Sequence, residues 1–129
     1  MECVASGNPD KKTVGVGMPA SLYLQRFGDL LFDAFGEQAY QVGSSLTGAI
    51  WRDVDVRVML PADVYVQMFG DPKRPQNNDR WCAYVMAFTA LGRQMTGLPI
   101  DFQIQEIGTA NAEEDKPRSA LFSCARIVK

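Results

Sequence analysis

The chain contains no histidine, the residue whose charge most readily changes near neutral pH. Its absence excludes serine–histidine and cysteine–histidine catalytic pairs, and every zinc site that includes a histidine. Cysteine is also scarce: Cys3, Cys82 and Cys124 are an odd number without metal-ligand spacing. We therefore expect free or buried thiols rather than a disulfide framework. Any chemistry is expected to depend on carboxylates.

The sequence also lacks a long apolar run and a large excess of one charge. No stretch is long and apolar enough to cross a bilayer, and residues 1–17 show no basic segment followed by an apolar block. We therefore expect a soluble, cytoplasmic protein that does not bind a membrane. The net charge of −2 argues against a surface built to coat nucleic acid.

What is present fits one globular domain. The chain has 129 residues, of which 47% are hydrophobic and 22% are charged, which is ordinary for a soluble domain. Residues 1–18 show little periodicity and predict a mobile arm or an edge strand around residues 13–16. Residues 19–129 predict a single domain.

Periodicity indicates the order of helices and strands. Helical spacing predicts one helix from Ala20 to near Gly36, capped by Ser21, and a longer one from a cap at Asp79 to Gly97. Alternation of apolar and polar residues predicts strands over 38–42, 53–60 and 98–107. Short helices are expected over 45–50 and 61–70, loops over 71–78 and 108–117, and a last apolar element over 118–129.

Two strands carry acidic side chains at alternate positions. In the first, Asp53, Asp55 and Arg57 share one face, and the intervening valines form the other. Two adjacent carboxylates repel each other unless a cation or a proton lies between them, so the pair suggests a divalent metal site. Asp101 begins a second strand of the same pattern. We therefore expect an α/β (α+β) fold in which the two strands share a small mixed sheet, with helices on one face and the aspartates on the other.

A glycine–serine turn precedes the first acidic strand. Gly43 and Ser44 follow the short strand at 38–42, and eight residues separate Ser44 from Asp53. A strand, this turn, a short helix, an Asp-Val-Asp strand and a later strand with Asp101 together resemble the nucleotidyltransferase fold of the DNA polymerase β superfamily. The resemblance covers residues 38–105.

The resemblance implies metal-dependent transfer of a nucleoside monophosphate from a nucleoside triphosphate to a hydroxyl acceptor. It implies that Asp53 and Asp55 bind two magnesium ions, and that Asp101 assists one metal and the acceptor hydroxyl. Gly43 and Ser44 would hold the phosphates of the nucleotide. Arg57 lies on the same face as the aspartates, where it is expected to pair with Asp55 or to contact a phosphate. The acceptor is expected to be a small molecule, a nucleic acid or a protein.

Three other interpretations stay open at this level. The aspartates can be a solvated strand face without function. The domain can be a non-enzymatic binding module on the same scaffold, which is favoured by Arg52 and by the short interval before Asp53. It can also be one half of a toxin–antitoxin pair, in which a minimal nucleotidyltransferase modifies or restrains a partner protein. The sequence leaves open whether the domain has a protein partner or forms a homo-oligomer.

Overall fold

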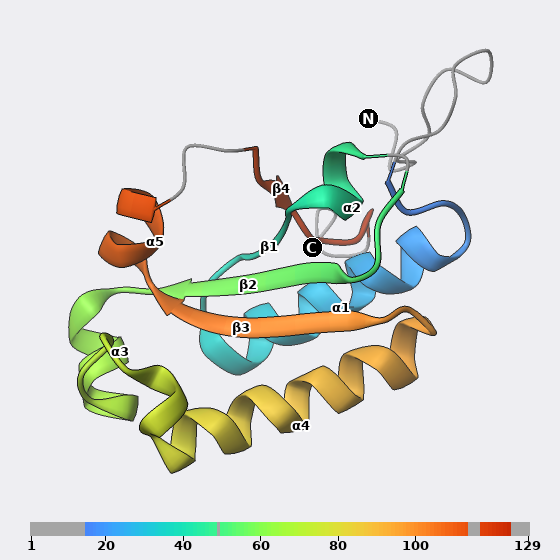
Figure 1. Cartoon of the computed structure of the whole chain (residues 1–129). Coiled ribbons are helices and arrows are strands. Elements are labelled where there is room, and N and C mark those ends of the chain that lie inside the picture. Colours follow the sequence, from blue (N-terminus) through green and yellow to red (C-terminus); the bar gives the residue numbers. More distant parts are fainter. Residues whose placement is uncertain (1–14, 49, 114–116, 125–129) are drawn as a thin grey trace.

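The computed structural model describes residues 15–48, 50–113 and 117–124 (Figure 1). Residues 1–14 of the predicted N-terminal arm therefore lie outside the described residues. Within the part that is described, Gly15 and Val16 are not in a strand. No helix in the described ranges is both long enough and apolar enough to cross a membrane.

The structure is mixed α and β, as expected, and is built on a four-stranded sheet. Its strands are β1 (Ala39–Val42), β2 (Val54–Leu60), β3 (Ile100–Glu106) and β4 (Ser119–Ala120), in the order β3-β2-β1-β4. β2 runs parallel to β3, and β1 runs antiparallel to both β2 and β4. The prediction that the two acidic strands are neighbours in one mixed sheet is confirmed.

The strand register aligns the acidic positions. Asp55 is the partner of Asp101 across the β2–β3 pair, and Val42 is the partner of Asp55 across the β1–β2 pair. Successive side chains of a strand point to opposite faces, so Asp55 and Asp101 project from the same face. The register therefore brings the acidic strands and the end of β1 together at one place.

Helices cover the opposite, apolar face. α1 (Ala20–Phe35) and α4 (Asp79–Thr96) pack against each other and against the sheet. Figure 1 shows α4 below the sheet, with the short helices α2 (Ser44–Thr47) and α5 (Ile107–Glu113) above it. The prediction that helices pack on one face of the sheet therefore holds for the two long helices only. The ring of Phe102 on β3 lies 6.3 Å from that of Phe27 and 5.8 Å from that of Phe88. The apolar residues on this face of β2 and β3 are buried: Val54, Val56, Val58, Leu60, Ile100, Phe102 and Ile104.

The remaining helices are short: α2 (Ser44–Thr47), α3 (Ala62–Phe69), the 3-10 turn η1 (Pro75–Asn77) and α5 (Ile107–Glu113). Both predicted helix caps are wrong. Pro19 precedes α1, and the Ser21 hydroxyl inside the helix donates to the Met18 sulfur at 3.3 Å. Asn78 caps α4 by accepting from the Trp81 backbone N–H at 2.9 Å. Because asparagine and aspartate cap helices about equally well, adjacent residues of these types leave the start undetermined by one position.

The predicted loop over 108–117 is also wrong in part, because α5 occupies Ile107–Glu113. The Glu106 carboxylate accepts from the backbone N–H of Thr109 at 2.8 Å, which satisfies one of the unpaired donors at the start of the helix. Ala110 is buried beneath it. A cap supplied by the last residue of a strand is a signal that composition does not reveal.

The cysteines depart from the expectation of free thiols. Cys82 is free, but Cys124 is disulfide-bonded; Cys3 lies outside the described residues. The expectation of free or buried thiols is therefore confirmed for Cys82 and wrong for Cys124.

Candidate functional site

The candidate site lies on the polar face of the sheet, where β2 and β3 begin. The side chains of Asp55 and Asp101 are 25% and 42% exposed. Both carboxylates are therefore accessible to a ligand, and the backbone register holds them side by side.

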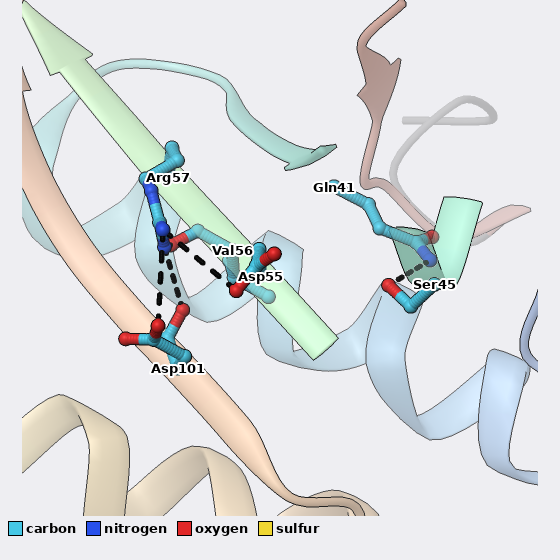
Figure 2. Close-up of polar contacts among 6 residues, drawn as sticks. All are labelled: Gln41, Ser45, Asp55, Val56, Arg57 and Asp101. Carbon is cyan, nitrogen blue, oxygen red and sulfur yellow. Dashed lines mark hydrogen bonds and ion pairs between the residues drawn. The ribbon is translucent and has the colours of Figure 1, made fainter. Parts of the chain in front are cut away.

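Arg57 bridges the two carboxylates. Its Nη2 lies 3.7 Å from Asp55 Oδ1 and 3.9 Å from Asp101 Oδ2. Figure 2 shows Arg57 between the two carboxylates. Its Nη1 donates to the backbone oxygens of Val56 at 3.0 Å and of Asp101 at 2.7 Å. With its side chain only 13% exposed, the guanidinium is held by two carbonyls and neutralises part of the acidic pair. The expected pairing of Arg57 with Asp55 is present, and Asp101 shares it.

Gly43 packs directly against Asp55. Its backbone, with φ 79° and ψ −163°, lies in a region that side chains rarely enter, and a Cβ built on Gly43 would overlap with Asp55 Oδ2. α2 starts at the next residue, Ser44. The glycine–serine turn is therefore in contact with the acidic cluster, defined here as Asp53, Asp55 and Asp101.

Two residues that the sequence reasoning missed hold this turn in place. Gln41, which is 7% exposed on β1, donates through Nε2 to the Oγ of Ser45 at 3.1 Å, and Ser45 is fully buried in α2 (Figure 2). A buried side-chain hydrogen bond of this kind ties α2 to β1 on either side of Gly43. Gln41 lies two residues after the buried Ala39 and therefore on the same face of β1. A polar residue at this buried position was the feature of the sequence that could have indicated the contact.

Asp53 is less closely tied to the cluster. It is exposed and directly precedes β2. Its charge contributes to raising the pKa of Asp55, so the two residues are within electrostatic reach of each other. The structure thus brings Asp55, Asp101, Arg57 and Gly43 into direct proximity, with Asp53 at the edge.

Asp55 is the member of the cluster whose pKa is raised. Burial raises its pKa above the ordinary value of 3.8, and Asp101 and Asp53 raise it further, against the opposing effect of Arg57. The folded state therefore retains a proton on Asp55 at pH values where the unfolded chain has lost it. It follows that the free energy of unfolding falls as the pH rises above about 3.8 through the pKa of the folded state.

Replacing Asp55 with asparagine is accordingly expected to raise the melting temperature at pH 7, because the substitution removes a charge that is partly buried beside two like charges. The gain should shrink at pH 4, because the raised pKa leaves a larger share of Asp55 protonated in the folded protein at that pH than at pH 7. Thermal unfolding followed by circular dichroism at the two pH values measures both effects. Asp63→Asn, on the exposed first turn of α3, is the control and should give no such gain. A lower melting temperature for Asp55→Asn at pH 7 would contradict the assignment.

The donor chemistry of the cluster fits magnesium, which prefers carboxylate oxygens. Two carboxylates converge, and their mutual repulsion is the kind that a divalent cation relieves. Across the described ranges, no three acidic, cysteine or histidine side chains are already arranged to hold a metal ion. The third carboxylate, Asp53, is exposed and directly precedes β2.

Comparison with protein-family models, with curated proteins and with solved structures gave no match. The functional argument therefore depends on the residues of this chain.

Proposed function

We propose that this domain is a nucleotidyltransferase of a minimal, single-domain type, which transfers a nucleoside monophosphate from a nucleoside triphosphate to a hydroxyl group. The observation that supports this proposal most strongly is that three separate sequence elements meet at one place in the fold. The glycine–serine turn, the Asp-Val-Asp strand and the third aspartate are separate in sequence, yet Gly43 touches Asp55 and Asp55 is the strand partner of Asp101. A solvated strand face without function would not require a glycine against a carboxylate.

The residues have distinct roles in this proposal. Asp53 and Asp55 would hold two magnesium ions, which stabilise the negative charge of the triphosphate during in-line displacement. Gly43 and Ser44 would lie along the phosphates. Arg57, already positioned between the carboxylates, would turn toward a phosphate oxygen when the nucleotide binds.

Asp101 would act on the acceptor. Its carboxylate would take the proton of the acceptor hydroxyl as the hydroxyl oxygen attacks the α-phosphorus. A bond forms between that oxygen and the α-phosphorus, and the bond between the α-phosphorus and the bridging oxygen breaks, so that pyrophosphate leaves with both bonding electrons. Asp101 is suited to this role because it is the more exposed of the two paired carboxylates.

A binding module without catalysis is the second candidate, and one observation favours it. Arg57 lies where a cation would otherwise neutralise Asp55 and Asp101. If this ion pair persists when nucleotide is present, the domain would recognise a nucleotide or a partner without reacting.

Pyrophosphate release distinguishes the two candidates. The protein is mixed with each of the four ribonucleoside triphosphates, magnesium and pooled small-molecule or RNA acceptors, and pyrophosphate is measured with a coupled phosphate assay. The enzyme predicts release that requires both magnesium and Asp55. Nucleotide occupancy without release, in the presence of every acceptor pool, would support the binding module and contradict the enzyme.

A further inference from the structure

A pocket of ≈ 450 Å³ lies beside the C-terminal half of β3. β3 is an edge strand of the sheet, and the pocket is bounded by this edge, by α3, by the start of α4 and by the first turn of α5. The residues that matter for the argument are Tyr65, Lys73, Trp81, Gln103, Gln105 and Glu106. None of the members of the acidic cluster lines this pocket. Its size is within the usual range for small-molecule sites.

Tyr65 supplies an unused polar group. The residue is 1% exposed and lines the pocket, yet its hydroxyl makes no hydrogen bond to any residue in the described part of the chain. Buried tyrosine hydroxyls normally have a partner. Burial raises the pKa of Tyr65, and nearby Asp71 and Glu106 raise it further, so the group is a neutral donor. Because Tyr65 lines the pocket and its hydroxyl has no partner among the described residues, we assign this donor to a ligand held there.

Trp81 supplies a fixed aromatic wall. Its Nε1–H donates to the backbone oxygen of Ile104 at 2.9 Å, which orients the indole against the edge of β3. Because this is the only hydrogen-bond donor of the indole, the ring offers the pocket an apolar surface. A ligand with a flat ring can pack against this face of the Trp81 indole.

The other polar groups select a neutral ligand. Gln103 and Gln105 each present an amide, with a donor and an acceptor, and neither amide bonds to another described residue. The lining contains one cationic side chain, Lys73, and one anionic side chain, Glu106, so its net charge is zero. A phosphate or a polycation would therefore find no excess of the opposite charge.

We infer that this pocket binds a neutral ring compound bearing hydroxyl groups, and that this compound is the acceptor. The second half of the inference rests on the nucleotidyltransferase function proposed above. Gln103 is two residues from Asp101 on the same face of β3, a separation of ~7 Å along the strand. One ring held by Gln103 would span this distance and bring a hydroxyl to the Asp101 carboxylate, where the transfer described above begins. A sugar-like ring and the ribose of a nucleoside share this chemistry.

Trp81 provides the test. In a Trp51→Phe background it is the only tryptophan, and its fluorescence is titrated with myo-inositol, D-glucose and uridine without magnesium or nucleotide. At least one compound should give a saturable change. Tyr65→Phe should weaken this binding about three- to tenfold, the usual effect of losing one neutral hydrogen bond. Tyr23→Phe, at an exposed position of α1, is the matched control and should leave the affinity unchanged.

A second measurement guards against misfolding of the variants. In the unaltered protein, the Nε1–H resonance of Trp81 should shift in NMR spectra as the same compound is added. Binding of either ring type supports the inference, and the compound that binds distinguishes a sugar-like acceptor from a nucleoside. No saturable response to any of the three compounds by either measurement, or equal affinity in Tyr65→Phe, would overturn it. If none of the three compounds binds, magnesium-dependent nucleotide binding at the acidic cluster is unaffected. If a compound binds in the pocket but the protein does not bind nucleotide, the pocket remains a ligand site and only its role as the acceptor site is removed.

Discussion

Replacing Asp101 with asparagine is expected to lower the rate of nucleoside monophosphate transfer by about 100- to 10,000-fold, the usual contribution of a positioned general base. Asparagine has nearly the same shape but cannot accept the proton of the acceptor hydroxyl. Asp101 should tolerate the change structurally, because its side chain is 42% exposed and its backbone oxygen still accepts from Arg57. The rate is measured as pyrophosphate release under saturating nucleotide.

Nucleotide affinity separates a chemical role of Asp101 from a general loss of structure. In Asp101→Asn the dissociation constant of the triphosphate should stay within about tenfold of the unaltered value, since Asp53 and Asp55 retain their carboxylates. Asp63→Asn, exposed on α3, should leave both the rate and the affinity unchanged. An Asp101→Asn variant with full activity would contradict the assignment of Asp101 as the base.

Gly43→Ala is expected to abolish magnesium-dependent nucleotide binding. The added methyl group would overlap with Asp55 Oδ2, so either the carboxylate or the turn must shift. The backbone at Gly43 is also strained for alanine, with an expected cost of about 1–3 kcal/mol in the free energy of unfolding. Calorimetric titration measures the binding, and chemical denaturation measures the stability.

Gly70→Ala is the matched control for this substitution. Gly70 has a similar backbone conformation, with φ 87° and ψ −141°, but a Cβ there would meet no atom within 4 Å. Both variants should therefore lose similar stability, and only Gly43→Ala should lose nucleotide binding. Equal nucleotide affinity in the two variants would show that the contact between Gly43 and Asp55 has no functional role.

The strands and their pairing were predictable because apolar and polar residues alternate over residues 54–58 of β2 and 100–105 of β3. That alternation gives the buried face without reference to the rest of the chain. It also placed Asp55, Arg57 and Asp101 on one face, and the structure confirms this placement. Strand pairing then determines contacts that alternation cannot specify, such as the sharing of Arg57 between two carboxylates.

The features that escaped prediction depend on single tertiary contacts. α5 begins where the Glu106 side chain caps it, and the turn at Gly43 is held by a hydrogen bond between Gln41 and Ser45. In each case, one polar side chain at the end of a strand or in the core decides the local structure. Composition and periodicity are properties of whole segments. They therefore predict helices and strands, but not contacts made by single side chains.

Calorimetric titration of a ribonucleoside triphosphate into the protein, with and without magnesium, tests the central claim most directly. If the acidic cluster beside Gly43 is a metal and nucleotide site, binding should be saturable only with magnesium, and should be lost in both Asp53→Ala and Asp55→Ala. Nucleotide binding that is independent of magnesium, or that survives both substitutions, would contradict the account.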